Sequence, residues 1–288
     1  MTGGVLKDQS FIALDLETTG LSATRDRIVE VAAVRFQLET GPRETYNQLV
    51  NPGVLMSDEV IAIHGITDSD VASAPSFAEI AKPLEAFLEG SILLAHNASF
   101  DLAFLACEMR RQNAPYPTQA TIDTCRLARL LLPEAPNYRL TTLIESFQLA
   151  NHGPAHRALP DALACAELFK LCVSRLPLGP DTSLENFWEN YPSVCHQLVS
   201  PAVSPKHPLA HALTEAIRQQ VDIRIGYHNA RNERIERIIT PLFLAGRGNY
   251  TYLEAFCHLR QENRQFRLER VFSFDKILEP SAVETVIL

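Results

Sequence analysis

Apolar and polar residues follow three short strand-like patterns within the first 50 positions of the chain. The middle pattern alternates apolar residues with charged ones, as expected of a strand in a sheet. The links between the patterns are short, which favours an antiparallel meander. The three strands are expected at residues 11–16, 28–36 and 46–50.

From residue 77 onward the spacing of apolar residues becomes helical, and short buried runs interrupt it. Two strands are expected in this stretch, at residues 92–95 and 121–124. Three strands followed by alternating helices and strands predict an α/β domain with a mixed sheet. Its helices are expected at residues 77–88, 100–111, 126–132, 140–147 and 160–175.

The character of the chain changes between residues 176 and 208, where six prolines occur. This stretch is interpreted as a linker with one short docking helix near residues 184–191. A helical pattern at residues 209–219 then opens a new unit. The strand-like runs that follow predict a small barrel, with strands at residues 221–227, 234–239, 250–257 and 266–271. The expected domain organisation is therefore 1–175, a linker at 176–208, and 209–288.

The composition is that of an ordinary soluble globular protein, with 46% hydrophobic and 21% charged residues among 288. No apolar run approaches the roughly 18 residues of a membrane span, and the N-terminus lacks the pattern of a secretory signal. The six cysteines form no C-x-x-C pair, so they are interpreted as free thiols in a reducing compartment. These features predict a cytoplasmic protein without a membrane partner.

The net charge of −8 is distributed unevenly. Residues 209–288 carry 11 Lys and Arg against 10 Asp and Glu, so the excess negative charge lies in the rest of the chain. An acidic front half is a mild argument against tight binding of duplex nucleic acid. Bound divalent cations would neutralise part of that charge.

Four acidic residues in the first part of the chain carry the candidate chemistry. Asp15 and Glu17 lie two positions apart in an apolar strand-like run, so both side chains leave the same face. Carboxylates this close repel each other, and one takes up a proton unless a cation holds both ionised. Asp101 and Asp161 add two hard oxygen ligands of the kind that Mg²⁺ and Mn²⁺ prefer. Together they predict a centre of two divalent cations that activates water for attack on a phosphate.

His156 is the expected general base of this centre. Pro154 precedes it and Pro160 lies beside Asp161, so the histidine is expected on a loop and the aspartate in the first turn of a helix. A histidine on a loop can approach a water molecule and accept its proton near neutral pH. The alternative base, His96, ends a strand-like run and is interpreted as a packing or supporting residue.

Three phrases, in this order, closely resemble the motifs of the DEDDh family of 3′→5′ exonucleases, which includes the proofreading epsilon subunit of bacterial DNA polymerase III. They are Phe11-Ile-Ala-Leu-Asp15-Leu-Glu17-Thr-Thr-Gly20, Leu94-Ala-His96-Asn-Ala-Ser-Phe-Asp101 and His156-Arg-Ala-Leu-Pro-Asp161. The resemblance covers about residues 8–175, and Ile63-His-Gly-Ile-Thr67 belongs to it. A sister class carries Tyr four residues before the last Asp, where this chain has Arg157.

The resemblance implies an RNase H-like fold, with helices on both faces of a mixed sheet. By motif, it implies that the four carboxylates bind two Mg²⁺ or Mn²⁺ ions and that His156 is the general base. It also places four residues beside the terminal nucleotide, with Leu21 as an apolar wedge and Phe100 stacked on a base. For each of the four, packing within the protein is the alternative: Thr18, Leu21, His64 and Phe100.

Residues 209–280 resemble a WYL domain, a small Sm-like or SH3-like barrel found in bacterial regulators. The resemblance lies in residues 216–227, 241–244, 252–257 and 264–270, and Thr251 replaces the eponymous Trp. It implies a nucleic-acid or nucleotide-like ligand at Tyr252, His258, Arg260, Arg264 and Arg267. The alternative is a solvated sheet on which Arg and Glu side chains pair.

These observations predict a metal-dependent 3′→5′ exonuclease that releases nucleoside monophosphates from single-stranded or frayed DNA ends. RNA is the alternative substrate, because the 2′-hydroxyl pocket that would decide between them is not legible in the sequence. A regulator that works through its WYL domain, with little nuclease activity, is the alternative from another class. The intact set of four carboxylates and one histidine argues against it.

Overall fold

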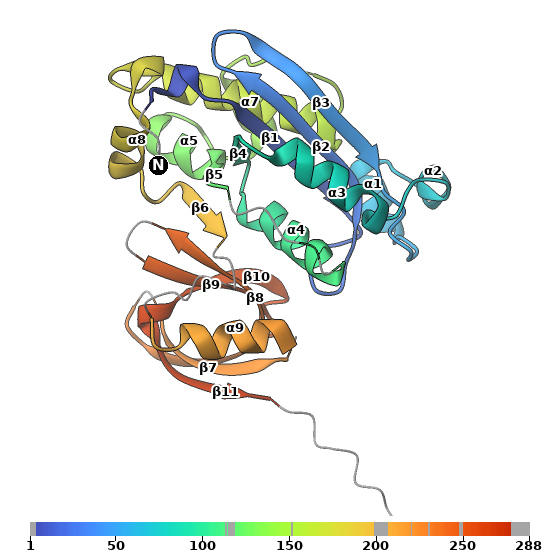
Figure 1. Cartoon of the computed structure of the whole chain (residues 1–288), viewed down its shortest axis with the longest axis vertical. Coiled ribbons are helices and arrows are strands. Elements are labelled where there is room, and N and C mark those ends of the chain that lie inside the picture. The colour runs from blue at the N-terminus through green and yellow to red at the C-terminus, as the bar shows by residue number, and fades with distance from the viewer. Residues whose placement is uncertain are drawn as a thin grey trace, which may run out of the picture. The chain divides into compact units, whose positions relative to one another are not determined.

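The protein is described by a computed structural model in which the chain divides into two compact units. The first unit contains residues 1–198 and 246–249, and the second contains residues 199–245 and 250–288. Each unit is described by itself below (Figure 1). The residues that the structure describes are 4–112, 114, 119–150, 152–198, 207–219, 221–229, 231–247 and 250–277.

The first unit is built on a mixed sheet of six strands in the order β6-β5-β4-β1-β2-β3. Strands β1, β2 and β3 form an antiparallel meander, which confirms the prediction for the first 50 residues. Strands β4 and β5 run parallel to β1, and β6 runs antiparallel to β5. The bounds are β1 Phe11–Thr18, β2 Ile28–Gln37, β3 Gly41–Leu49, β4 Ile92–Ala95, β5 Thr121–Asp123 and β6 Cys195–Leu198.

Helices lie on both faces of this sheet, with α3 in front of it and α7 behind it in Figure 1. The five expected helices are present with small shifts of their ends, as is the short helix expected near residues 184–191. Two short helices, α1 and α2, had no clear periodicity in the sequence. The bounds are α1 Asp58–His64, α2 Asp68–Val71, α3 Phe77–Leu88, α4 Ser99–Arg111, α5 Thr124–Leu131, α6 Leu140–Ser146, α7 Ala158–Ser174 and α8 Leu184–Asn190, with 3₁₀ turns η1 Leu6–Asp8 and η2 Gly179–Asp181.

Strand β1 is buried on both faces, because α7 covers one face of the sheet and further helices cover the other. An aromatic layer joins β1 to its neighbours on the α7 side. The ring of Phe11 lies 4.9 Å from that of Phe169 in α7 and 5.7 Å from that of Phe36 in β2. Alternate residues of β1 therefore point toward α7, and Asp15 and Glu17 follow Phe11 on that face.

The second unit is an antiparallel sheet in the order β10-β9-β8-β7-β11, with helix α9 packed on its apolar side. Within the described strands β10 and β11 end this order, so a closed barrel remains a prediction. The bounds are α9 Ala210–Gln219, β7 Ile223–His228, β8 Arg234–Arg247, β9 Tyr250–Cys257, β10 Glu262–Arg267, η3 Leu268–Arg270 and β11 Val271–Lys276.

The strand predicted at residues 266–271 was wrong. That segment contains the end of β10, the 3₁₀ turn η3 and the first residue of β11. Leu268 is fully buried in the core, but it lies in the 3₁₀ turn between the two strands and not in a strand.

Residues 184–198, which lie in the stretch interpreted as a linker, supply α8 and β6 to the first unit. The domain boundaries at residues 175 and 208 stay a prediction, because compactness alone does not establish independent folding. All six cysteines are free thiols, as expected. None of the described helices is long and apolar enough to cross a membrane.

We expect Phe169→Ala to lower the free energy of unfolding of the first unit by about 3–5 kcal/mol, because it opens a cavity beneath β1. Urea denaturation followed by the fluorescence of Trp188, the one tryptophan of the chain, measures this, since its ring lies 5.1 Å from that of the buried Phe187. Leu55→Ala is the control, because Leu55 is 86% exposed. A loss below about 1 kcal/mol for Phe169→Ala would contradict this account of the core.

Candidate metal centre and ligand pocket

Three carboxylates from two elements meet at one end of β1. One oxygen each from Asp15, Glu17 and Asp161 lies within 4.8 Å of the other two. Asp15 and Glu17 lie on the α7 face of β1, and Asp161 lies in the first turn of α7. The structure therefore brings together residues that are separated by more than half of the chain. We call these three residues and Asp101 the acidic cluster.

Small side chains allow α7 to approach the sheet at this point. Ala158 and Ala162 of α7 are fully buried and pack with Ala32 and Val34 of β2 in one apolar group. Ala32 is the direct neighbour of Asp15 in the sheet. Larger residues here would push the first turn of α7, and Asp161 with it, away from β1.

Asp101 enters the cluster from the first turn of α4 and is almost fully buried. Its carboxylate accepts hydrogen bonds from the backbone of Leu16 and from its own amide. Its charge is the largest electrostatic contribution that raises the pKa of Asp15, so the two carboxyls lie close together. Within the described residues, Asp101 is not part of the tightest group, which holds the other three.

Burial raises the pKa of every carboxyl in the cluster, and mutual repulsion adds to the effect for Asp15 and Glu17. The pKa of Asp15 is raised well above its usual value, and those of Glu17 and Asp101 rise to about 8. The pKa of Asp161 is also raised by burial. Near neutral pH these groups cannot all be ionised unless positive charge is added. Hard oxygen donors in this state suit Mg²⁺ or Mn²⁺.

A fifth carboxylate, Glu30, lies beside the cluster but is fully engaged. It is 1% exposed and pairs with Glu17 in the register of β1 and β2. Arg157 donates to both of its oxygens, at 3.1 and 2.9 Å, and the Ala158 N–H donates to it at 3.0 Å. Glu30 was not recognised in the sequence, because a lone Glu in a strand pattern resembles a solvent-facing position.

His156 lies on an exposed loop that enters α7, as expected from the prolines around it. Its backbone adopts the left-handed conformation, with φ of 59°, which costs a non-glycine residue roughly 1–2 kcal/mol. The His156 N–H donates to Asp161 Oδ2 at 3.1 Å. The structure thus ties the backbone of the expected base to a residue of the acidic cluster.

The two other histidines of the motifs have different surroundings. Both ring nitrogens of His96 are engaged, Nδ1 with Thr124 Oγ1 at 3.1 Å and Nε2 with the Tyr138 carbonyl at 2.9 Å. His96 is therefore a supporting residue. The Nδ1 of buried His64 accepts from the Ile66 N–H at 3.0 Å, and its Nε2 has no partner among the described residues.

The other expected substrate contacts lie at the end of β1, on the turn that follows it and on α4. Leu21 is 69% exposed, whereas Phe100 packs against Phe104 with 4.9 Å between ring centroids. The Thr18 hydroxyl donates to the Gly20 carbonyl at 2.6 Å, which holds the turn. A Cβ at Gly20 would lie 2.5 Å from a carboxylate oxygen of Asp26, so a larger residue would displace this carboxylate, which accepts from the Ser22 N–H at 2.7 Å.

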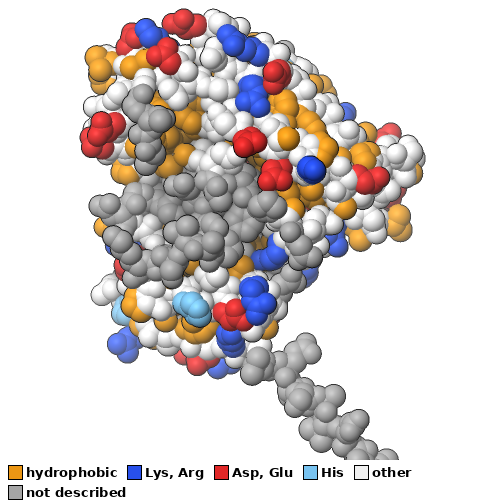
Figure 2. Space-filling view, in the orientation of Figure 1, with side chains coloured by type: hydrophobic (Ala, Val, Ile, Leu, Met, Phe, Trp, Pro, Cys, Tyr) orange, Lys and Arg blue, Asp and Glu red, His pale blue; other side chains and the backbone are white. Residues whose placement is uncertain are grey.

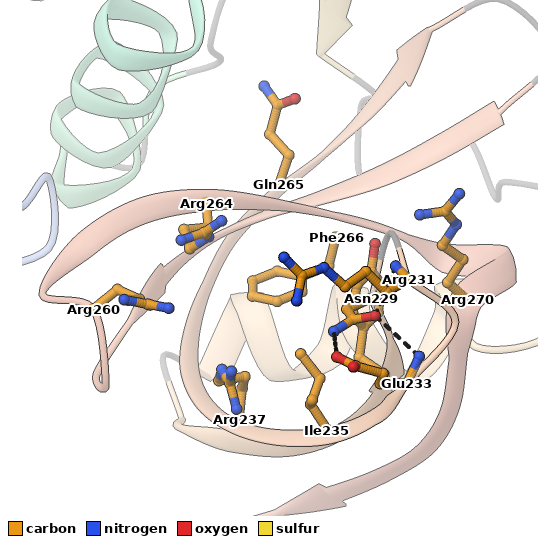
Figure 3. A pocket seen from close by; sticks show the side chains of 11 residues that line it. Asn229, Arg231, Glu233, Ile235, Arg237, Arg260, Arg264, Gln265, Phe266 and Arg270 are labelled. Atoms are coloured by element: carbon orange, nitrogen blue, oxygen red, sulfur yellow. Dashed lines mark hydrogen bonds between the residues drawn. The ribbon is translucent and has the colours of Figure 1, made fainter.

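The second unit contains a cavity of about 410 Å³ that five arginines line. We call it the arginine pocket. Figure 3 shows Arg237, Arg260 and Arg264 on one side, Arg270 on the other and Arg231 across the centre. Tyr227 and Phe266 line it too, with their rings edge to face at 5.3 Å. Figure 2 shows Lys and Arg side chains on the visible face of this unit.

Two of the five ligand-binding residues expected in this unit, Arg260 and Arg264, line the arginine pocket. The other three lie outside its lining. His258 contacts Thr240 and Asp222, and Arg267 pairs with Glu269 and lies over the ring of Tyr250. Arg231, Arg237 and Arg270 also line the pocket and were missed in the sequence.

The charge of the arginine pocket is largely uncompensated. Within the described part of the chain, no carboxylate pairs with Arg231, Arg237, Arg260 or Arg270, while Arg264 pairs with Glu262 at 2.9 Å. Glu233, the one acidic residue of the lining, accepts a hydrogen bond from the Asn229 side chain at 2.7 Å. A pocket of this charge in a chain of net charge −8 is suited to an anion.

Two family models match the chain, one in each unit. The model described as "Exonuclease" matches residues 12–169, and the model described as "WYL domain" matches residues 208–275. The first match contains every residue of the acidic cluster and His156. The second contains every residue that lines the arginine pocket.

Curated relatives resemble the first part of the chain. The PolC-type DNA polymerase III of Oceanobacillus iheyensis is 39% identical over 175 residues, which cover 59% of this chain and 12% of that protein. The epsilon subunit of DNA polymerase III from Treponema pallidum is 36% identical over 167 residues, covering 57% of this chain and 77% of the subunit. The chain thus spans only a small part of the PolC-type relatives.

Solved structures share the fold. Escherichia coli exonuclease I in complex with a dA16 oligonucleotide matches with a TM-score of 0.57 at 18% identity, covering 86% of this chain and 55% of that one. The nuclease domain of the DEDDh family member 3′hExo, bound to rAMP, matches with a TM-score of 0.50 at 22% identity, covering 56% of this chain and 90% of that one.

We expect the affinity for Mn²⁺ to rise with pH up to about 8. Cations bind the ionised carboxyls, whereas the raised pKa values of Glu17 and Asp101 keep the metal-free groups protonated below that pH. Isothermal titration at pH 6, 7 and 8.5 measures the affinity, and buffers of different ionisation enthalpy measure the protons released. An affinity that is independent of pH would contradict the prediction.

The same pKa shifts determine whether the stability of the metal-free protein rises or falls with pH. The folded state holds protons that the unfolded chain releases near pH 4, so stability in EDTA should fall as pH rises from about 4 to 8. Added Mn²⁺ should restore it. Asp181→Asn is the control, because this carboxyl is 65% exposed and should leave the profile unchanged.

Proposed function

Because the chain belongs to the exonuclease family and carries a WYL domain, we propose that it is a metal-dependent 3′→5′ exonuclease acting on single-stranded or frayed DNA ends. One observation carries the proposal. Asp15 and Glu17 of β1 meet Asp161 of α7 within 4.8 Å, with Asp101 beside them. No arrangement of surface ion pairs explains this, because burial raises the pKa of all four carboxyls.

The residues of the acidic cluster fit a pair of divalent cations. When bound, Mg²⁺ or Mn²⁺ would supply the positive charge that lowers the pKa of a water and stabilises the charge that develops on the phosphate and the leaving 3′ oxygen. The four carboxylates would hold that charge in place and lose their bound protons as they do so.

His156 is proposed as the residue that accepts the proton of the attacking water. Its loop is exposed, so the imidazole can reach a water on the open side of the cluster. Its backbone N–H is held by Asp161 Oδ2, which fixes the start of the side chain relative to the cluster. His96 is not available for this role, because both of its ring nitrogens are engaged.

Four residues are proposed to contact the terminal nucleotide: Thr18, Leu21, His64 and Phe100. His64 is supported by its hydrogen bonds, because Nδ1 accepts from the Ile66 N–H and the proton therefore resides on Nε2. This buried donor has no partner among the described residues and is suited to a sugar or phosphate oxygen. Leu21 is supported by its exposure on the turn after β1.

The arginine pocket supports a second binding site, for a single-stranded nucleic-acid segment. Arginine is suited to bidentate contact with phosphate, and four of the five arginines have no carboxylate partner among the described residues. Half-buried Tyr227 also lines the pocket, and its ring can contact a base, with buried Phe266 packed against it. This site takes Arg260 and Arg264 from the sequence-based set and adds Arg231, Arg237 and Arg270.

The DNA polymerases among the relatives favour DNA as the substrate, and RNA is the alternative. A WYL-based regulator without nuclease activity is disfavoured, since the acidic cluster and His156 are complete and assembled. Both alternatives are outcomes of the experiment that follows.

We expect 5′-labelled single-stranded DNA to be shortened one nucleotide at a time from its 3′ end in the presence of Mn²⁺, and matched RNA to be shortened more slowly. Asp15→Asn and Asp161→Asn should each lower the rate by at least about 10³-fold, because they remove cation ligands. Asp181→Asn is the matched exposed control. Wild-type rates in the cluster variants, or cleavage in EDTA, would contradict the proposed function.

We expect the double variant Arg231→Glu and Arg270→Glu to weaken binding of a labelled dT10 oligonucleotide by at least about tenfold, because two phosphate contacts are reversed in charge. Fluorescence anisotropy in EDTA, in an Asp161→Asn background, measures binding without digestion. Arg218→Glu is the control, since Arg218 lies on α9 outside the pocket and is 72% exposed. If the double variant binds dT10 as tightly as the protein without these two substitutions, the arginine pocket is not the binding site for the oligonucleotide.

A further inference from the structure

The loop that carries His156 is held in an unfavourable backbone conformation next to an ion pair whose carboxylate is buried. His156 has φ of 59°, in a region that few non-glycine residues occupy. The residue that follows it, Arg157, forms a bidentate pair with Glu30 of β2. The next residue, Ala158, donates its N–H to the same carboxylate. Both residues after the base are therefore fixed to one buried side chain.

The contacts on the two sides of His156 are different in kind. The His156 N–H donates to Asp161 Oδ2, so one contact leads into the acidic cluster. The contacts of Arg157 and Ala158 lead instead to β2, through Glu30. Glu30 lies opposite Glu17 in the register of β1 and β2. The same part of the sheet therefore positions both a carboxylate of the acidic cluster and the His156 loop.

Both oxygens of Glu30 are engaged within the protein. Its two oxygens accept three hydrogen bonds, and the side chain is 1% exposed. It does not belong to the group of carboxylates whose oxygens converge among the described residues. Burial and the other carboxylates of the cluster raise the pKa of Asp15 and Glu17, and the negative charge of Glu30 adds to this, while Arg157 lowers the pKa of Glu17. The two charges of the pair thus act on Glu17 in opposite directions, and what distinguishes the pair is its geometry.

We propose that Glu30 and Arg157 are positioning residues. They hold the His156 loop in the conformation in which the imidazole can accept the proton of the attacking water. This inference rests on the proposed function. Arg157 is 39% exposed and Glu30 is buried, so the pair connects a loop at the surface to a buried position on β2. Because the planar guanidinium makes two contacts, it fixes both the orientation of the loop backbone and its distance from Glu30. A single contact would not fix the orientation.

The test is a set of variants at the two ends of the pair. Glu30→Gln keeps the shape of the side chain but replaces one acceptor by a donor that faces the guanidinium. Arg157→Ala removes the other end without placing a new group in the core, and Arg157→Lys keeps the charge with one contact in place of two. Glu134→Gln is the control, because Glu134 pairs with Arg175 at 3.1 Å at the other end of α7, where both side chains are about half exposed.

We expect Glu30→Gln and Arg157→Ala to lower kcat by about 10–100-fold on single-stranded DNA, since small displacements of a catalytic group cost rates of this size. KM and the affinity for Mn²⁺ should change by less than about twofold to threefold, which a general loss of structure would not produce. Arg157→Lys should retain an intermediate kcat, and Glu134→Gln should match the wild type.

A double-mutant cycle distinguishes positioning from an independent effect. In a His156→Ala background, Glu30→Gln should lower the remaining rate by less than about threefold, because the residue that it positions is gone. An equal fold loss in both backgrounds would overturn the proposal. So would a wild-type kcat in both Glu30→Gln and Arg157→Ala.

A measurement without catalysis keeps the inference separate from the proposed function. Amide hydrogen exchange of residues 152–158 should be faster in Glu30→Gln and in Arg157→Ala than in the wild type, while exchange in β1 stays unchanged. Unchanged exchange in this loop would overturn the positioning role whatever the activity. A wild-type protein without nuclease activity would instead overturn the proposed function and leave the loop measurement to decide the structural role.

Discussion

The first unit depends on the forced proximity of groups that repel one another. Carboxylates from β1, α4 and the start of α7 share one end of the sheet, and burial raises the pKa of each of them. The metal-free fold therefore stores unfavourable electrostatic free energy at this point, and the remaining contacts must offset it. Packing of α7 against β1 and β2 is the main source, because the rings of Phe11 and Phe169 and the alanines of α7 lie on the same face of the sheet as the carboxylates.

The geometry around this constraint follows from residue size. Alanines on β2 and α7 let the helix approach, so that the first turn of α7 reaches the strand that carries Asp15 and Glu17. A loop with a left-handed histidine then enters the helix. The pair of Arg157 with buried Glu30 holds the loop against β2. The start of α7 therefore determines both the position of Asp161 and the conformation of the His156 loop.

Much of the fold and most of the candidate site follow from local sequence patterns. Alternation in β1 places Asp15 and Glu17 on one face, and the prolines around His156 indicate a loop followed by a helix start. Glu30 escaped prediction because its partner is 127 residues away, and no local pattern marks such a contact. The arginine pocket escaped in part for a related reason, because arginines are common on surfaces and only the folded sheet shows which of them face one cavity. In the sequence, Leu268 resembles a strand residue, because buried apolar side chains occur both in strands and in turns such as η3.

Every residue that lines the arginine pocket belongs to the second unit, whereas every member of the acidic cluster belongs to the first. Neither site borrows a side chain from the other. A substitution in the lining of the arginine pocket therefore leaves every side chain of the acidic cluster in place, so selection can act on the two sites one at a time.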